Sequence, residues 1–278
     1  MAWTKRLRAL AAAALLMAPA ATWAAGGDVA DSYGGRDMVV FAPSHLPPAG
    51  KRALVIVMHG GLGNAGRIVA AQAESGLNLD AEAERDGFVV AYLNGTPVTR
   101  RLGARFLGWN AGGGCCGMSA ENGIDDVGYI EGAARYLEGK YGVDPARVFA
   151  IGHSNGAMMA QRLMCETRLL AAAVAISGPL NLPVQSCPSR AGRILALHGA
   201  DDQNVPIAGG RGTRGISGAT FASEDHSRAA FTASGATYEL QIVPGADHAL
   251  ARIDAAIQAA EGQTIAHKAA RFFGLAGR

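Results

Sequence analysis

The chain has 278 residues, of which 49% are hydrophobic and 17% charged, enough for one large α/β domain or two small ones. Its formal net charge of +2 includes Lys5, Arg6 and Arg8, and no acidic residue lies beside them in residues 1–24. Without that segment the charge is −1. Nothing in the composition therefore suggests nucleic acid or an anionic membrane surface as a partner.

Residues 1–24 have the pattern of a secretory signal peptide. A basic start is followed by a short apolar stretch at residues 9–18 and by small residues up to Ala24. The apolar stretch is too short to span a bilayer stably, so we favour export over a retained membrane anchor. We expect a secreted or periplasmic protein, a monomer, whose catalytic domain comprises residues 25–278.

Four cysteines follow the leader: Cys115, Cys116, Cys165 and Cys187. In an oxidising compartment an even number suggests two disulfides. A bond between Cys115 and Cys116 would close a strained eight-membered ring, so we expect each to pair with one of the other two. Metal binding is the weaker interpretation because no C-x-x-C or neighbouring histidine pattern is present; we predict no metal and no cofactor.

Short apolar runs alternate with amphipathic segments along the chain. Such alternation predicts the α/β class, with a mostly parallel sheet covered by helices on both faces. Asp125 and Asp126 are assigned to a helix start rather than to catalysis. The predicted strands are residues 33–41, 53–58, 88–93, 148–151, 171–176, 193–197 and 238–243, and the predicted helices are residues 77–85, 124–140, 155–163, 223–233 and 263–273.

The most informative stretch is the G-x-S-x-G pentapeptide around Ser154, between a predicted strand and a predicted helix. Such a turn exposes a serine hydroxyl above the sheet edge, and its glycines avoid a clash of Cβ atoms with neighbouring backbone. The alternative is a glycine-rich turn that happens to contain a serine. The turn would also aim the Asn155 N–H at a bound carbonyl.

Two further segments follow predicted strands. The Gly-rich turn at residues 59–64 suits a second oxyanion donor, with Gly61 as the first choice and Leu62 as the second. Its spacing does not fit a nucleotide-binding loop. The long loop at residues 94–122 carries Trp109 and Asn110, a pair that suits a substrate-facing wall, although Trp109 could equally anchor the loop.

Ser154, the Asp201/Asp202 pair and His248 each lie just beyond a predicted strand, in the order of an α/β-hydrolase triad. A serine hydroxyl needs an imidazole to take its proton, and the imidazole needs a carboxylate to fix its tautomer. Either aspartate could serve. The other histidines are assigned to packing and turns (His59, His153 and His198) or to surface and loop positions (His45, His226 and His267).

The chain resembles the poly(3-hydroxybutyrate)-depolymerase-like and feruloyl-esterase group of α/β-hydrolases, carbohydrate esterase family 1. The stretches that carry the resemblance are VIVMHGG, GWNAGGGCCG, IDDVGYI, YGVDPARVFAIGHSNGAMMAQRLMCE, SGPLNLPVQSC, ILALHGADDQNVPIAGG and the final ADH. The segment around His248 departs from the Gly-Gly-His-x-Trp-Pro of that group. The chain also ends at Arg278 without a surface-binding domain, which favours soluble esters or oligomers over solid polymer.

The resemblance implies the α/β-hydrolase fold and a set of roles. Ser154 would be the nucleophile, Asp202 the acid member and His248 the base. Gly61 and Asn155 would form the oxyanion hole. Trp109 and Asn110 would shape the acyl pocket, and all four cysteines would lie at disulfide positions.

These observations predict an exported serine carboxylic-ester hydrolase that works through an acyl-enzyme. Candidate substrates are feruloyl or acetyl esters of plant polysaccharide, hydroxyalkanoate oligomers and aromatic polyesters. The alternatives are acyl transfer by the same triad and a binding protein that kept the fold and lost the chemistry. Peptidase activity is a minor further possibility.

Overall fold

The computed structural model describes residues 26–101, 105–188, 192–214 and 218–276. The expected leader, residues 1–24, lies outside these ranges. Among the described residues, no helix combines the length and the hydropathy that crossing a bilayer would require.

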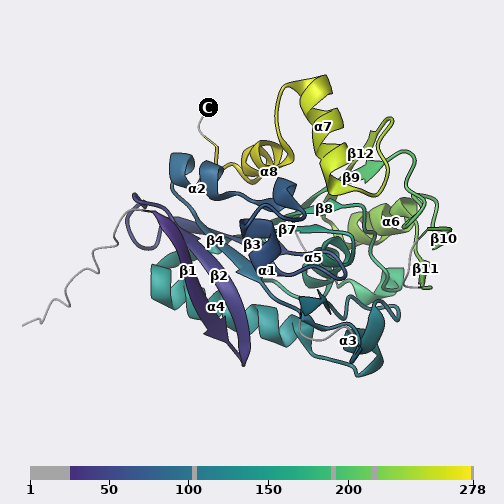
Figure 1. The fold of residues 1–278 in the computed structure, drawn as a ribbon, viewed down its shortest axis with the longest axis horizontal. Helices are drawn as coiled ribbons and strands as arrows, with labels where there is room; N and C mark the ends of the chain where they lie inside the picture. Colours follow the sequence, from purple (N-terminus) through teal and green to yellow (C-terminus); the bar gives the residue numbers. More distant parts are fainter. Residues whose placement is uncertain (1–25, 102–104, 189–191, 215–217, 277–278) are drawn as a thin grey trace, which may run out of the picture.

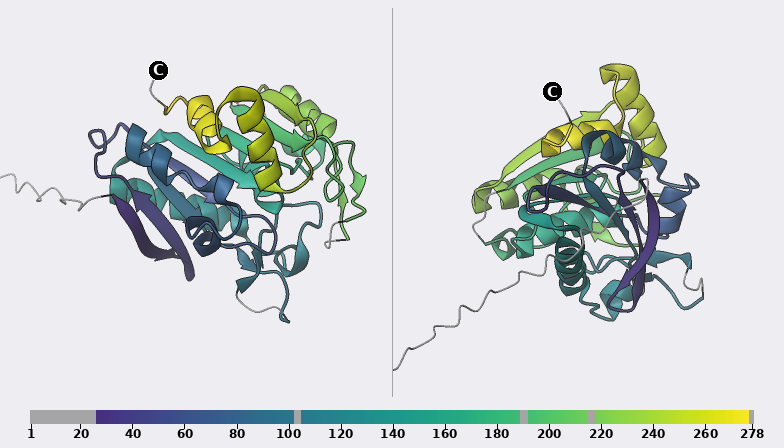
Figure 2. Two further views of the ribbon diagram at one scale, coloured as in Figure 1. Left: turned by 45° about the horizontal axis from the view of Figure 1, so that its top comes forward. Right: turned by 90° about the vertical axis from the view of Figure 1, so that its left-hand side faces the viewer.

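An eight-stranded sheet forms the centre of the fold (Figures 1 and 2). In spatial order its strands are β1 (Gly27–Tyr33), β2 (Arg36–Ala42), β4 (Val89–Leu93), β3 (Arg52–Met58), β7 (Val143–His153), β8 (Ala172–Ile176), β9 (Arg193–Gly199) and β12 (Thr237–Val243). Neighbours from β4 to β12 run parallel, whereas β2 pairs antiparallel with β1 and β4. The predicted mostly parallel sheet is confirmed.

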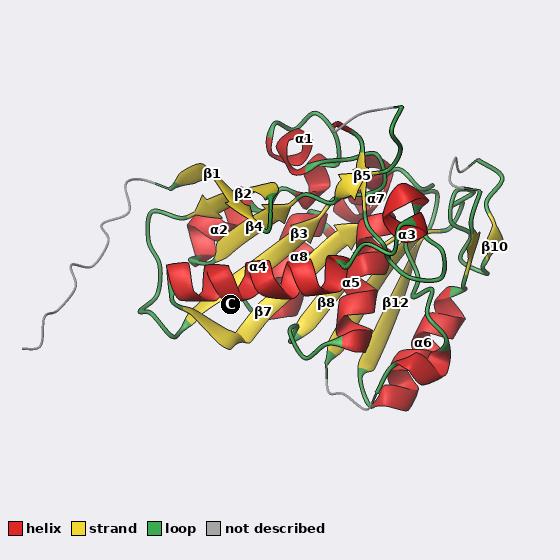
Figure 3. Cartoon of the chain, turned by 90° about the horizontal axis from the view of Figure 1, so that it is seen from below, coloured by secondary structure: helices red, strands yellow, loops and turns green. Residues whose placement is uncertain are grey.

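Helices cover both faces of the sheet (Figure 3). In β3 the side chains of Leu54, Ile56 and Met58 pack in one apolar layer, and Val55 and Val57 pack in the other. Burial on both faces explains why the central strands are continuous apolar runs. One face carries α4 (Asp126–Tyr141), α5 (Asn155–Glu166) and α6 (Glu224–Ser234), and the other carries α1 (Ala65–Val69), α2 (Asp80–Asp86), α7 (Leu250–Glu261) and α8 (Ile265–Phe273).

The remaining elements are short. They lie in the segments that connect the main strands and helices. They are the turns η1 (Ser75–Leu77) and η3 (Val184–Ser186), helix α3 (Gly117–Glu121), and the strand pairs β5 (Thr96–Pro97) with β6 (Leu107–Gly108) and β10 (Gly210–Arg211) with β11 (Thr220–Phe221).

Every predicted strand and helix has a counterpart. The short elements α1, α3, β5, β6, β10 and β11 were not predicted, and neither were β1 and α7. The expected strand at residues 33–41 is two strands, because Gly34 and Gly35 adopt positive φ and turn the chain between them. β1 lies at the sheet edge with mostly exposed side chains and so lacks an apolar run. In α7 the buried residues are Leu250, Ile253 and Ile257, so the helical pattern of apolar residues in its sequence is weak.

Asp125 and Asp126, at the start of α4, have different roles. The Asp125 side chain caps the helix by accepting from Gly128 N–H, as predicted for a helix start. Asp126 is fully buried, and its carboxylate binds the Arg36 guanidinium at 2.5 Å and the Asn110 N–H at 2.7 Å. This carboxylate therefore ties β2, α4 and the long loop together, which the sequence did not indicate.

The expected cysteine pairing is wrong. The disulfides join Cys115 to Cys116 and Cys165 to Cys187. Cys115 lies 3.5 Å from the Met158 sulfur, on the first turns of α5. Cys165 is seven residues further along that helix, which corresponds to about 10 Å. A disulfide needs Cα atoms within about 7 Å, so Cys115 is not placed to bond Cys165, and Cys187 is bonded to Cys165 instead.

We expect the Cys165–Cys187 bond to carry most of the disulfide contribution to stability. It closes a loop with a sequence separation of 22 residues, for which chain entropy predicts about 3 kcal/mol. The Cys115–Cys116 bond has a separation of 1 and restricts the unfolded chain little. Urea unfolding with and without reductant measures the loss, and a Cys165→Ala/Cys187→Ala variant should lose little more on reduction. An unfolding free energy unaffected by reductant in the wild type would refute this.

Candidate active site

Ser154 lies in the turn between β7 and α5. Its backbone has φ +53° and ψ −119°, a conformation that residues other than glycine rarely adopt. A Cβ on Gly152 would overlap the Gly156 carbonyl group, and one on Gly156 would overlap the Met58 carbonyl oxygen at the end of β3. The two glycines thus let α5 start directly against the sheet edge. This is the close approach that the pentapeptide predicts.

The three residues of the predicted triad lie in one hydrogen-bonded chain. His248 Nε2 is 2.9 Å from Ser154 Oγ, and His248 Nδ1 is 2.7 Å from Asp202 Oδ2. The serine hydroxyl can donate to Nε2 while Nδ1–H donates to the carboxylate, the arrangement needed for proton removal from a serine. The structure thus brings together residues that are 94 and 46 positions apart in the sequence.

The structure distinguishes between the two aspartates. The Asp202 side chain is fully buried, and its second oxygen accepts from the N–H groups of Asn204 and Val205, both at 2.8 Å. Asp201 is exposed and lies at the turn, where its N–H donates to the Ala246 carbonyl. Of the two aspartates, Asp202 is the one hydrogen-bonded to the His248 ring.

Two backbone N–H groups face the space beside Ser154. Of the described residues, none accepts a hydrogen bond from Gly61 N–H or Asn155 N–H. By contrast, Leu62 N–H donates to the Leu107 carbonyl at 2.8 Å and is therefore occupied. Gly61, Asn155 and Ser154 line one cavity, so this geometry favours Gly61 over Leu62 as the second donor.

The electrostatics of the triad favour a neutral base and a charged acid. Burial lowers the pKa of His248, with a smaller lowering from the nearby His153, against the raising effect of Asp202. Burial raises the pKa of Asp202, but hydrogen bonds from His198 and His248 outweigh it and leave that pKa well below its usual range. Neutral imidazole next to charged carboxylate is the state that can accept a proton from serine.

A second histidine–carboxylate pair lies behind Asp202. The His198 side chain is fully buried, with Nδ1 2.6 Å from Glu224 Oε1 and Nε2 3.2 Å from Asp202 Oδ2 and 2.8 Å from the Val205 carbonyl. Burial lowers the pKa of His198, but its hydrogen bonds to Asp202 and Glu224 raise it to about 9. His198 is buried and bonded to the turn after β9, as predicted, and its bonds to two carboxylates, which the sequence did not indicate, favour the protonated ring.

Trp109 and Asn110 do not form the expected wall of the acyl pocket. Trp109 is fully buried, and its indole N–H donates to the His59 carbonyl at 3.0 Å. The Asn110 amide donates to the Ile124 carbonyl and accepts from Gly112 N–H. Their polar groups bond to the protein interior, and these bonds hold the long loop in place. The alternative assignment of Trp109 as a loop anchor describes its position.

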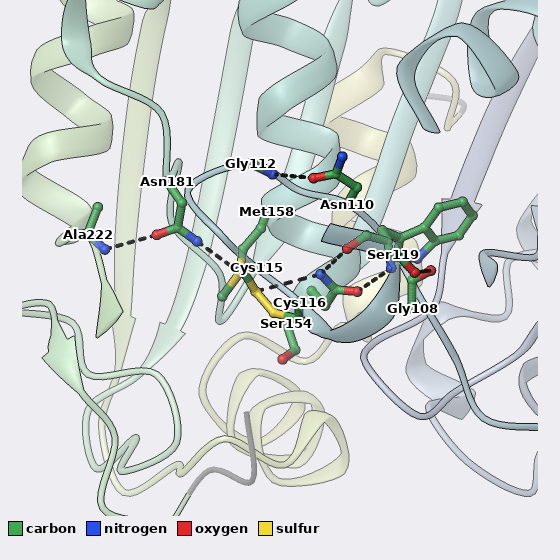
Figure 4. The surroundings of a disulfide bond; sticks show 12 residues. Gly108, Asn110, Gly112, Cys115, Cys116, Ser119, Ser154, Met158, Asn181 and Ala222 are labelled. Carbon is green, nitrogen blue, oxygen red and sulfur yellow. Dashed lines mark hydrogen bonds between the residues drawn. A yellow bond between two sulfur atoms is a disulfide. The ribbon is translucent and has the colours of Figure 1, made fainter. Parts of the chain in front are cut away.

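A cavity of about 520 Å³ opens beside Ser154. Cys116 of the vicinal disulfide is part of its wall, and Cys115 lies 3.8 Å from the Asn155 side chain. Figure 4 shows the disulfide beside Ser154 and Met158. Its apolar side chains include those of Leu62, Val98, Met158 and Phe221. In the described part of the chain, no cluster of three or more His, Cys, Asp or Glu side chains is arranged to hold a metal ion.

Comparisons with known proteins identify a family and a shared fold. The sequence pattern of the phospholipase/carboxylesterase family matches residues 45–220, a range that includes Ser154 and Asp202. Esterase 2 of Thermogutta terrifontis, solved after phosphonylation by sarin, is 16% identical with a TM-score of 0.60. The superposition covers 91% of this chain and 97% of that one, which shows a shared fold.

Two curated relatives cover the middle of the chain. NocK of Nocardia uniformis subsp. tsuyamanensis, which is named as an esterase, is 32% identical over 160 residues, 57% of this chain and 42% of its own length. Feruloyl esterase B of Piromyces equi is 29% identical over 183 residues, 63% of this chain and 31% of its own length. The chain thus spans less than half of either relative.

We expect His198 to stabilise the fold in a pH-dependent way. Its folded pKa of about 9 lies above the ordinary value of 6.5, so its contribution is complete below pH 6.5 and is lost as the pH rises through 9. The difference in unfolding free energy between the wild type and His198→Gln should shrink by up to about 3 kcal/mol over that window. Urea unfolding at pH 6 to 10 measures it. A constant difference would contradict a cationic His198.

Proposed function

The chain belongs to the phospholipase/carboxylesterase family of α/β-hydrolases, and on this premise we propose that it is a serine esterase that cleaves carboxylic esters through an acyl-enzyme. The observation that carries the proposal is the hydrogen-bonded chain from Ser154 through His248 to Asp202. The fold, the strained serine and the two free N–H groups beside it all support the same chemistry.

In the proposed reaction, Ser154 Oγ bonds to the ester carbonyl carbon as its proton passes to His248 Nε2. The negative carbonyl oxygen is stabilised by the N–H groups of Gly61 and Asn155. The imidazolium then returns its proton to the alcohol oxygen as the C–O bond breaks. A water molecule attacks the acylated Ser154 with the same base, and the carboxylic acid leaves.

The cavity favours an apolar or aromatic acyl group. Its walls near Ser154 include the Met158 thioether and the Phe221 ring, which suit contact with a planar ring. We therefore place hydroxycinnamoyl esters first, with support from the resemblance to feruloyl esterase B. Hydroxyalkanoate oligomers, acetyl esters of polysaccharide and related polyesters remain the other proposed substrates. No cofactor enters the proposed reaction.

We also propose that the protein is exported and works as a monomer on soluble or oligomeric esters. The support for export is the leader-like sequence of residues 1–24 and the two disulfides of the described chain, which persist in oxidising compartments. In this view residues 25–278 form the catalytic domain.

Substitutions in the triad test the proposed roles. Ser154→Ala and His248→Ala should each lower kcat/KM by several powers of ten, and their effects should not add, because each removes the same proton transfer. Asp202→Asn should cost far more than the matched control Asp201→Asn, since Asp202 alone contacts His248. Steady-state hydrolysis of a nitrophenyl ester measures these losses.

A fluorophosphonate should label the wild type and leave Ser154→Ala unlabelled. Equal losses at the two aspartates would contradict the assignment of the acid. Absence of labelling in a folded wild-type protein would instead favour a binding protein on the hydrolase fold.

A substrate panel tests the acyl preference. Methyl ferulate should give a higher kcat/KM than a terephthalate ester, hydroxybutyrate oligomers or acetylated xylan, because the apolar cavity matches a single planar ring with a short linker. Parallel reactions with an added alcohol acceptor measure the ratio of acid to new ester. A higher rate on acetylated xylan would overturn the aromatic preference, and mostly new ester would indicate an acyltransferase.

A further inference from the structure

Glu74 is a largely buried carboxylate outside the triad, and it contacts two segments of the site. Its two oxygens both lie 3.0 Å from Gly60 N, and Oε1 lies 2.6 Å from His153 Nδ1. The side chain is 14% exposed. Gly60 directly precedes Gly61, and His153 directly precedes Ser154. The carboxylate therefore lies between the turn that offers the oxyanion donor and the turn that offers the nucleophile.

His153 extends this connection to the third segment. Its Nε2 is 2.9 Å from the main-chain carbonyl oxygen of His248. Both of its ring nitrogens thus face oxygen atoms, a carbonyl and a carboxylate, and both must carry hydrogen to bond them. Burial lowers the pKa of His153, but the hydrogen bond and charge of Glu74 outweigh that effect and leave the pKa raised.

We propose that Glu74 and His153 are a buried positioning pair, which holds the oxyanion turn, the nucleophile turn and the base in register and places a positive charge beside the base. This inference rests on the proposed ester hydrolysis, because it assigns a role in that reaction. Neither residue touches the reacting atoms in this assignment. The pair acts through Gly60, through the backbone next to Ser154 and through the backbone of His248.

The positive charge should act on the base itself. The rings of His153 and His248 are 5.0 Å apart between centroids, and Glu74 lies on the far side of His153. The cation is thus the nearer charge, and it disfavours a second cation on His248. The other charged or titratable groups around the two histidines are Asp202 and His198 behind the base, His59 beside Glu74, and Asp201, Asp247, Arg214 and Arg252 around the adjoining cavity.

Two substitutions of Glu74 separate geometry from charge. In Glu74→Gln the amide can accept from Gly60 N–H and donate to Nδ1 of a neutral His153, which keeps its bond to the His248 carbonyl. This variant should keep its plateau kcat/KM within about threefold, while the acid limb of its pH profile moves to higher pH by about half a unit to one unit. Glu74→Ala leaves Gly60 and His153 without their partner and should lower kcat by about 10- to 100-fold with little change in KM.

The controls separate a positioning role from a purely structural one. Glu261→Gln removes a surface carboxylate that pairs with Lys268, and it should leave the pH profile and the rates unchanged. Melting curves report whether the variants are folded, and titration with a fluorophosphonate gives the active fraction. Nitrogen-15 NMR of the histidine rings at neutral pH should show His153 protonated on both nitrogens in the wild type and on one in Glu74→Gln.

The NMR measurement needs no substrate, so it distinguishes failure of this inference from failure of the proposed function. A wild type that binds but does not hydrolyse esters would remove the proposed function and leave the ionisation of His153 to be judged by NMR. The inference is overturned if His153 is neutral in the wild type. It is also overturned if folded, fully titrated Glu74→Ala and Glu74→Gln both reproduce the wild-type profile.

Discussion

The site depends on the backbone conformation of one residue, Ser154. A serine at φ +53° is unfavourable in isolation and persists only when the surroundings fix it. The fixing contacts are the packing of Gly156 against the end of β3 and of Gly152 against the start of α5, where no side chain would fit. The same packing points the first N–H of α5 at the space in front of the serine oxygen. The same contacts therefore fix both the conformation of Ser154 and the direction of the Asn155 N–H, which is the oxyanion donor proposed above.

The charges around His248 alternate in sign through the interior. On one side of His248 lie His153 and Glu74, which are 2.6 Å apart. On the other side Asp202 lies 2.7 Å from His248 and 3.2 Å from His198, and His198 lies 2.6 Å from Glu224. Such a row is tolerated in a buried site because each charge has a partner and further hydrogen bonds. With His153 protonated as proposed above, this row carries one net negative charge beside neutral His248. In the proposed reaction, the transfer of the Ser154 proton to His248 makes the row neutral.

The sequence predicted the elements whose signal is local. The apolar runs located the central strands. The pentapeptide and the chain order located Ser154, the Asp201/Asp202 pair and His248, and the family resemblance favoured Asp202 over Asp201. The sequence did not reveal roles that depend on a contact with a residue far away in the chain. Glu74 and Glu224 lie in segments with no motif, and their roles come from His153 and His198, which are 79 and 26 residues away. The cysteine pairing failed for a related reason, since it depends on which turn of α5 the long loop packs against.

That long loop explains why the wall of the cavity and the oxyanion hole cannot move independently. Asn155 offers its backbone N–H to the site, while its side chain accepts from Trp109 N–H at 2.7 Å and donates to the Trp109 carbonyl at 3.0 Å. The same amide nitrogen lies 3.8 Å from the Cys115 sulfur, whose disulfide partner Cys116 faces the cavity (Figure 4). A shift of the cavity wall would break two buried hydrogen bonds to Asn155, the residue proposed to supply an oxyanion donor, at a cost of about 1–3 kcal/mol for each group left unpaired. The buried Trp109 therefore holds the disulfide wall against the turn that carries Ser154, although its own side chain does not line the cavity.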